Sequence, residues 1–163
     1  MSVEETIQSQ LIAQFPVLEG KVRVQRARRV FAEVPADQAT AVIEYAYKTL
    51  GFTIICTITG LDLGDKLAAL YHIAHQNGVV LNLQVAVPKD NPVLPTVSAL
   101  YPPADHYERE LIDLLGFKVE GLPNGNRYPL PDSWPAGQYP LRKDWKVEML
   151  PPSAAGESEM KNG

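Results

Sequence analysis

Hydrophobic residues recur with helical or strand periods through the first half of the chain. In residues 4–15 and 35–50 the apolar side chains lie three or four positions apart, and a Pro or a Gly ends each run, so both segments are predicted to be amphipathic helices. Between them, residues 21–34 alternate valines with other residues, which predicts one long strand or two short ones. The basic residues of this strand region are Lys21, Arg23, Arg26, Arg28 and Arg29.

A further strand is expected over residues 52–59, which are rich in β-branched residues, and the glycines of residues 60–64 favour a turn. The single cysteine, Cys56, lies inside this strand. A lone cysteine can neither close an internal disulfide nor hold an iron–sulfur cluster by itself. Because no second cysteine or cationic motif accompanies it, we expect Cys56 to be a buried structural thiol.

Two antiparallel strands are predicted across the Asn77-Gly78 pair, a sequence typical of tight hairpin turns. Residues 79–87 have a plain strand pattern, whereas residues 66–75 alternate like a strand but are rich in helix-favouring Leu and Ala. The hairpin signal decides in favour of a strand. Residues 88–95 are then expected to be a loop, and residues 96–100 a short helical piece.

One more amphipathic helix is predicted before Gly116, because glycine readily adopts the left-handed conformation that ends many helices. Asp105, followed three residues later by Glu108, matches a capping box at the start of this helix. Leucines at helical spacing form its apolar face. Asp113 is assigned to another face, where a pair with Arg109, four residues earlier, is expected.

Beyond residue 118, prolines and glycines recur too closely for a helix or a central strand. This segment still contains large apolar side chains that need a surface to bury against: Tyr128, Leu130, Trp134, Tyr139, Leu141 and Trp145. We therefore predict an α+β fold over residues 1–118, with a mixed sheet of about four or five strands and helices packed on one side. Residues 119–147 are predicted to form an extended, proline-rich docking arm, and residues 148–163 a disordered tail.

Composition and charge limit the classes of function. The 163 residues, 45% of them hydrophobic, suffice for one domain with a core. A net charge of −4 does not suit a nucleic-acid-binding domain. No stretch has the run of about 18 apolar residues that a membrane span needs, and the N-terminus lacks a signal-peptide pattern. The basic strand region has three interpretations: a charged sheet edge that resists aggregation, a contact for an acidic partner, or a nucleic-acid site.

Candidate catalytic and metal-binding residues are few. His72 and His75 have H-x-x-H spacing, but on a strand they point to opposite faces, and no further ligand accompanies them at metal-binding spacing. His106, Glu108 and Glu110 lie two residues apart, so their side chains diverge around a helix. No phosphate-binding glycine loop and no nucleophile with a partner base is present. We therefore expect no catalytic, cofactor-binding or metal-binding residue in this chain.

Five short blocks in the last third of the chain carry a family resemblance: Glu108-Arg109-Glu110, Asp113-Leu114-Leu115-Gly116-Phe117, Glu120-Gly121-Leu122-Pro123, Leu130-Pro131-Asp132-Ser133-Trp134 and Pro140-Leu141-Arg142-Lys143-Asp144-Trp145. In order and spacing they resemble the thirty-kilodalton subunit family of respiratory complex I and its relatives in energy-converting nickel–iron hydrogenases. Leu122 stands where the complex I form usually has a histidine. The run from Tyr139 to Trp145 looks more like the membrane-bound hydrogenase form.

The resemblance implies a non-catalytic scaffold subunit of a membrane-associated, complex I-like oxidoreductase, most similar to an energy-converting nickel–iron hydrogenase. The alternative is the equivalent subunit of complex I. The implied partners are the large subunit and the iron–sulfur small subunit, which would hold the nickel–iron centre and the iron–sulfur clusters, while this chain would hold no cofactor. The implied location is peripheral, on the cytoplasmic face of the cell membrane.

Ten residues are assigned to partner binding: Glu108, Arg109, Glu110, Arg127, Trp134, Leu141, Arg142, Lys143, Asp144 and Trp145. From the residues alone, Glu108 to Glu110 would be an ordinary exposed helical turn. Within the family resemblance, these charges are polar anchors between the helix, the following coil and neighbouring subunits. Arg142 to Asp144 can be interpreted as a solvated patch or as the polar part of an interface between two apolar anchors.

Overall fold

The computed structural model describes residues 1–152. Its α-helices are α1 (Val3–Gln14), α2 (Ala39–Lys48) and α3 (Ala104–Leu115). Its strands are β1 (Val22–Arg26), β2 (Arg29–Val34), β3 (Ile54–Asp62), β4 (Lys66–Ala74), β5 (Val80–Pro88), β6 (Val93–Pro95) and β7 (Lys118–Glu120). Short 3-10 helices are η1 (Pro16–Leu18), η2 (Ala36–Gln38) and η3 (Val147–Met149).

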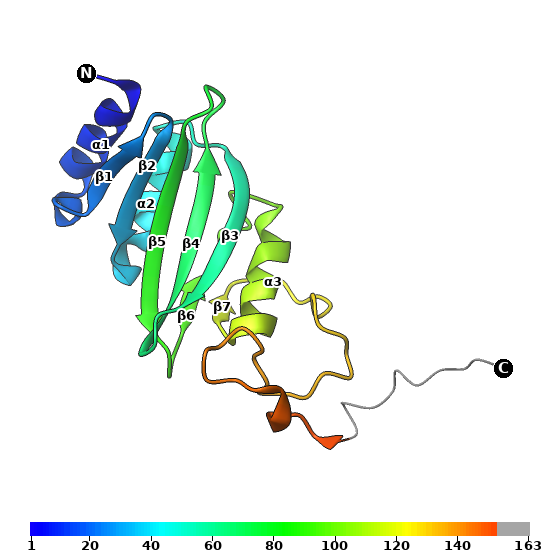
Figure 1. Ribbon diagram of the computed structural model, residues 1–163. Coiled ribbons are helices and arrows are strands. Elements are labelled where there is room, and N and C mark those ends of the chain that lie inside the picture. The colour runs from blue at the N-terminus through cyan, green and yellow to red at the C-terminus, as the bar shows by residue number, and fades with distance from the viewer. Residues whose placement is uncertain (153–163) are drawn as a thin grey trace.

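Five strands form one mixed sheet in the order β1-β2-β5-β4-β3 (Figure 1). β2 and β5 run parallel, and all other neighbours in this sheet are antiparallel. β4 and β5 pair continuously across the Asn77-Gly78 turn, from Ala74 opposite Val80 to Lys66 opposite Pro88. The predicted α+β fold with a mixed sheet is therefore confirmed, and the hairpin was correctly predicted.

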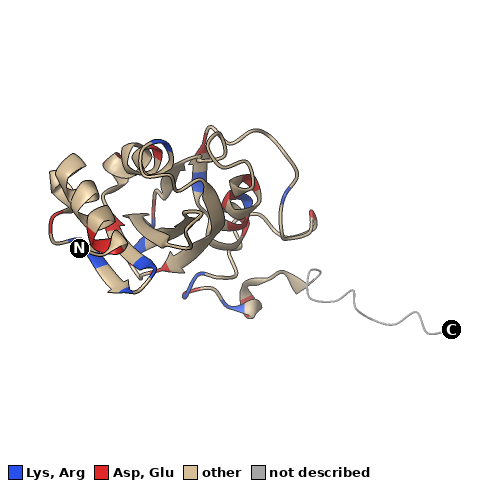
Figure 2. Cartoon of the chain, turned by 90° about the horizontal axis from the view of Figure 1, so that it is seen from above, with Lys and Arg blue, Asp and Glu red and all other residues tan. Residues whose placement is uncertain are grey.

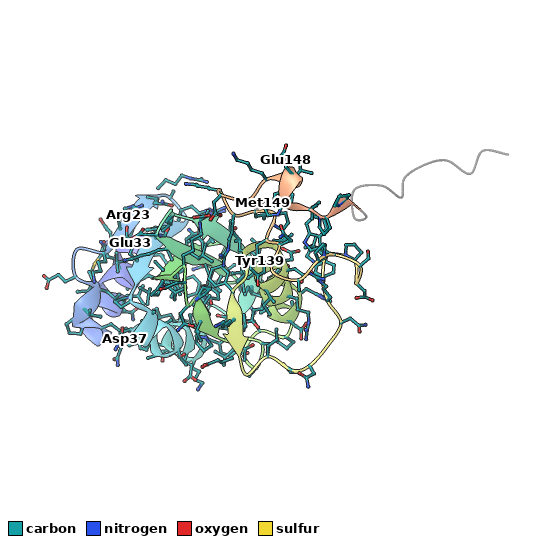
Figure 3. The ribbon with its side chains drawn as sticks, turned by 90° about the horizontal axis from the view of Figure 1, so that it is seen from below. Arg23, Glu33, Asp37, Tyr139, Glu148 and Met149 are labelled. Carbon is teal, nitrogen blue, oxygen red and sulfur yellow. The ribbon has the colours of Figure 1, made fainter. Side chains whose placement is uncertain are left out.

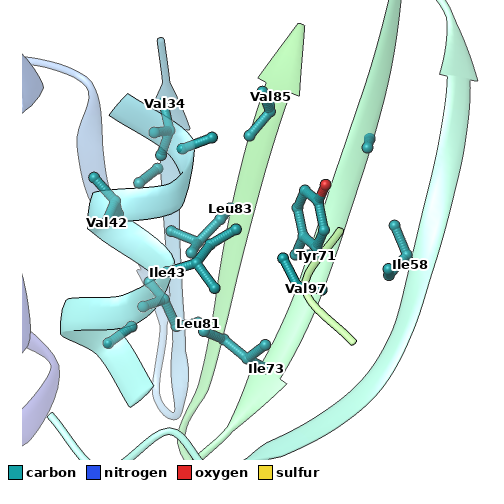
Figure 4. Packing of buried hydrophobic residues seen from close by; sticks show 14 of the residues in the cluster. Val34, Val42, Ile43, Ile58, Tyr71, Ile73, Leu81, Leu83, Val85 and Val97 are labelled. Carbon is teal, nitrogen blue, oxygen red and sulfur yellow. The ribbon is translucent and has the colours of Figure 1, made fainter. Parts of the chain in front are cut away.

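The helices pack on one face of this sheet (Figure 2). Ile43 of α2 lies beside Leu81 and Leu83 of β5 in the core (Figure 4), and all three side chains are at most 2% exposed. Such burial of apolar surface is the main source of stability in a domain of this size.

α3 packs close to β3 because Gly60 has no side chain. A Cβ atom at this position would overlap Leu115 Cδ1 and would lie 2.8 Å from Leu111 Cδ2, so the two leucines fill the space that a larger residue would need. The predicted turn at residues 60–64 was placed too early, since β3 continues through Gly60 to Asp62. Gly60 thus serves helix packing rather than chain reversal.

Cys56 was wrongly predicted to be buried. The register of β3 with β4 shifts between Ile55 and Thr57, and the Cys56 side chain at this irregularity is exposed. A β-bulge of this kind re-aims side chains relative to strict alternation, so a residue inside a strand-like run need not face the core.

The segment between the hairpin and α3 also differs from its prediction. The expected loop over residues 88–95 contains β6, which pairs in parallel with β7. The expected helical piece over residues 96–100 consists of turns, in which the N–H groups of Leu100 and Tyr101 donate to Val97 C=O at 3.0 and 2.9 Å. These turns lead directly into α3.

Candidate docking surface

The docking arm, residues 119–147, leaves β7, loops beside α3 and returns past the lower end of the sheet in Figure 1. Within the described residues, every buried side chain lies at or before Phe117, and the arm contains none. Polar contacts with α3 and with the end of β3 therefore decide the path of this arm.

Glu108 is a buried carboxylate on α3, with 1% of its surface exposed. Its carboxylate accepts hydrogen bonds from Thr96 Oγ1 and from the Val97 N–H group, both at 2.6 Å. Burial raises the pKa of Glu108, although both hydrogen bonds oppose this shift. The predicted capping box is wrong, because the N-cap residue is Pro103 and no side chain caps the helix. Glu108 instead fixes the turns before the helix.

Arg109 on α3 is the first anchor of the arm. Its Nε donates to Asp105 Oδ1 at 2.5 Å, and its Nη2 donates to Pro123 C=O at 2.7 Å. The backbone of Gly125 also packs against this guanidinium, since a Cβ there would lie 2.6 Å from Nη2. The expected pair between Arg109 and Asp113 is not the one that forms in the structure.

Asp113 is the second anchor of the arm, and its burial was not predicted. Although it was assigned to a polar face, it is 7% exposed. Its Oδ1 accepts from Arg127 Nε at 2.9 Å, and its Oδ2 accepts from the Leu130 N–H group at 3.0 Å. Arg127 Nη1 in turn donates to Trp134 C=O at 2.8 Å. One carboxylate thus holds a side chain and a backbone group of the arm, and charge-assisted hydrogen bonds of this kind are stronger than neutral ones.

Asp62, at the end of β3, is the third anchor, and only 2% of its side chain is exposed. Its Oδ2 accepts from Lys89 Nζ and from the Lys143 N–H group, both at 2.8 Å, and its Oδ1 accepts from the Gly64 N–H group at 2.9 Å. Burial acts to raise the pKa of Asp62, but these hydrogen bonds outweigh it and lower the pKa to about 2. Lys89 Nζ also lies 3.4 Å from Asp144 Oδ1.

Gly116 ends α3 and receives the returning arm. Its φ of 78° is left-handed, as predicted for this helix end. A Cβ at Gly116 would lie 2.6 Å from the Tyr139 ring, so the ring rests on the glycine backbone. Arg142 stacks over that ring, with its Cζ 4.7 Å from the ring centroid, and its Nε donates to Leu115 C=O at 2.7 Å. The same glycine therefore serves both the helix end and the arm.

The two tryptophans fold the arm upon itself. Trp134 Nε1 donates to the backbone carbonyl of Gln138, and Trp145 Nε1 donates to the side-chain Oε1 of the same residue, both at 2.8 Å. Their ring centroids lie 6.0 Å apart. Both side chains are half-buried, so the loop between them has a small apolar centre of its own.

Several residues near the end of the arm are exposed. We call Leu141, Lys143, Asp144, Val147 and the adjoining Met149 its outward face; Leu141, Val147 and Met149 are 57%, 58% and 51% exposed. Figure 3 shows Met149 and its neighbour Glu148 on the surface near Tyr139. A hollow of about 190 Å³ here is lined by Gly137, Gln138, Tyr139, Arg142, Asp144, Trp145 and Met149.

The predicted partner-binding residues thus fall into two groups. The following side chains make contacts within the chain: Glu108, Arg109, Arg127, Trp134, Arg142 and Trp145. Leu141, Lys143 and Asp144 are exposed, although Asp144 also pairs with Lys89, and Glu110 is half-buried. Partner binding by these residues stays a prediction. The predicted tail, residues 148–163, begins within η3, and its residues 153–163 lie outside the described residues.

The histidines of the H-x-x-H pair have separate polar partners. His72 lies between Thr59 Oγ1, at 3.0 Å, and Asn82 Oδ1, at 2.6 Å, whereas His75 Nδ1 accepts from the Asn77 N–H group at 3.0 Å. Within residues 1–152, no three His, Cys, Asp or Glu side chains gather closely enough to hold a metal ion. In the same range, no helix is both long and apolar enough to cross a bilayer.

Comparison with known proteins adds a family to this geometry. Residues 32–149 match the family described as the 30 kDa subunit of respiratory-chain NADH dehydrogenase. This match begins within β2 and continues to η3, so it covers α3, the docking arm and the residues Asp62, Arg109 and Asp113 that hold the arm.

Individual relatives come from several kinds of complex. A subunit of the F(420)H(2) dehydrogenase of Methanosarcina mazei is 35% identical over 144 residues, covering 86% of this chain and 90% of that protein. The membrane-bound hydrogenase subunit beta of Pyrococcus furiosus is 32% identical over 159 residues, covering 90% of this chain and 88% of that protein. A chain of the membrane-bound sulfane sulfur reductase, an archaeal respiratory membrane complex, has a TM-score of 0.78 at 28% identity, covering 88% of this chain and 85% of that one.

Proposed function

Because the chain belongs to the family of the 30 kDa subunit of respiratory-chain NADH dehydrogenase, we propose that it is a non-catalytic scaffold subunit of a complex I-like membrane oxidoreductase. In this role the outward face of the docking arm binds the neighbouring large and iron–sulfur subunits. Those subunits would hold the clusters and carry the electrons. The chain itself would lie at the aqueous, cytoplasmic surface of the membrane-bound assembly.

The observation that carries this proposal is that some side chains of the arm bind its own domain while others stay exposed. Arg127 and Arg142 contact α3, whereas Leu141, Val147 and Met149 are more than half exposed. Exposed apolar side chains next to a polar rim are typical of protein–protein contact sites. An arm already held on its own domain loses less conformational entropy when a partner binds.

For the kind of complex, we propose an energy-converting nickel–iron hydrogenase. The alignment with the membrane-bound hydrogenase subunit beta, which covers 90% of this chain, supports this assignment. The alternative is a dehydrogenase, either complex I or a related enzyme, and it is favoured by the 35% identity to the F(420)H(2) dehydrogenase subunit of Methanosarcina mazei. Nickel content separates the two, because a hydrogenase large subunit would contain nickel and a dehydrogenase would not.

The proposal is tested by native purification of the tagged chain from membranes solubilised in mild detergent, with mass spectrometry and metal analysis. We expect large and iron–sulfur subunits to co-purify, and Leu141→Asp to reduce their recovery about tenfold or more. The matched control is Val17→Asp, since Val17 is 44% exposed and lies in η1, far from the arm in sequence. Recovery of the chain alone, or equal loss with both variants, would contradict the proposal.

A further inference from the structure

The sheet has a second face, which lies opposite the helices and is open in Figure 1. Val30, Ala32 and Val34 of β2 are buried towards the helices, so by strand alternation Glu33 points to the open face. Lys21 lies directly beside Glu33, because its C=O accepts the Glu33 N–H group at 3.1 Å. The basic strand region therefore places part of its charge on this open face.

A groove of about 320 Å³ lies on this face where β2 and β5 approach the start of β4. Its floor includes Gln84 and Ala86 of β5, and the small side chain of Ala86 leaves room between the longer ones. Lys21 and Lys66 stand at its margins, and both are exposed.

The charge in this groove is positive. Its one carboxylate, Glu33, lies 3.9 Å from Arg23 Nη1, and Arg23 also covers the Phe31 ring at 4.1 Å. Among residues 1–152, neither Lys21 nor Lys66 takes part in a salt bridge. Two uncompensated ammonium groups thus flank a groove in a chain whose net charge is −4.

We infer that this groove binds an acidic segment of a neighbouring subunit, with a carboxylate seated between Lys21 and Lys66. The identity of the partner rests on the proposed function. The groove adjoins the arm, because Lys66 pairs opposite Pro88 and the next residue, Lys89, contacts Asp144. Figure 3 shows Glu33 on the same side of the molecule as Met149.

A protein partner suits this groove better than a nucleic acid does. A polyanion would meet the long-range repulsion of a chain with a net charge of −4, and nucleic-acid modules are usually basic overall. A short acidic segment needs only local complementarity, which sets orientation and specificity at protein interfaces.

Zero-length carbodiimide crosslinking of the purified native complex tests this inference, because it joins a lysine amine to a carboxylate that is already in contact. We expect mass spectrometry to find Lys21 or Lys66 joined to an Asp or Glu of a partner subunit. Lys48 is the control lysine, since its Nζ is 3.1 Å from Glu44 of its own helix. The Lys21→Gln, Lys66→Gln variant should weaken partner binding about five- to tenfold at low salt, and Lys48→Gln should not.

The outcomes separate this inference from the proposed function. If Lys143 or Lys146 of the arm crosslinks to a partner and the groove lysines do not, the proposed function stands and the groove inference is overturned. If no partner co-purifies, both are overturned. Retention of the chain on DNA that is lost in the Lys21→Gln, Lys66→Gln variant would overturn the inference in favour of nucleic-acid binding.

Discussion

The sheet domain and the docking arm of this chain are held in place by different forces. Up to Phe117, apolar side chains of helices and strands fill a continuous core. In the arm no residue is buried, and its path is set by Arg127, by Arg142 and by two backbone N–H groups that reach carboxylates of the domain. A core made of many contacts tolerates the loss of any polar one, whereas the arm depends on a few specific partners. One chain can therefore carry a stable platform and a separately tunable contact segment.

The largest effect should follow a substitution in the core. Leu83 is completely buried in the centre of the sheet, and Leu83→Ala is expected to lower the free energy of unfolding by about 2–5 kcal/mol. Leu141→Ala makes the same chemical change on the arm, where Leu141 is 57% exposed, and should cost less than about 0.5 kcal/mol. Urea unfolding followed by circular dichroism measures both. Similar losses in the two variants would break the distinction between the two regions.

A smaller and local effect is expected at Asp113. Asp113→Asn keeps the size of the side chain but removes the charge that binds Arg127 and the Leu130 N–H group. It should destabilise the attachment of the arm by about 1–3 kcal/mol, with little change in the unfolding midpoint of the sheet domain. Trypsin cleavage after Arg127 should therefore accelerate. Glu110→Gln, on the same helix, is the control, and equal acceleration in both variants would refute a specific role for Asp113.

The smallest expected effect is that of pH on the attachment of the arm. It should be absent near neutrality and appear only in acid. The pKa of Asp62 is lowered to about 2 from its usual value of 3.8, so its contribution to stability is present above pH 3.8 and is lost as the pH falls through 2. The arm should become more sensitive to pepsin over this interval before the sheet domain unfolds. Asp62→Asn should weaken this pH dependence of arm cleavage, because it removes one of the carboxylates that hold the arm. An unchanged profile in the variant would show that another group is responsible.

The regular elements could be predicted from the sequence because their burial is periodic and local. The hairpin at Asn77-Gly78 and the helix end at Gly116 both rest on backbone rules that act within a few residues. These are features on which the α+β prediction was based, and they are present in the structure.

The burial of particular polar residues could not be predicted, because distant segments decide it. The Leu130 N–H group that binds Asp113 is 17 residues away, and the Lys143 N–H group that binds Asp62 is 81 residues away. Glu108 was assigned to a cap for the same reason, since its true partners, Thr96 and Val97, precede the helix. A charged residue that the periodicity places near the apolar face of a helix is a signal that could have pointed to Asp113.

Hydrogen exchange of the isolated chain, read by mass spectrometry, tests the central claim most directly: carboxylates of the sheet domain hold the docking arm in place before any partner binds. We expect amides of residues 119–147 to exchange faster than those of β4 and β5 but clearly slower than in an unstructured peptide. Asp113→Asn and Asp62→Asn should remove this protection while β4 and β5 keep theirs. Exchange of the arm at unstructured rates in the unaltered chain would contradict this claim.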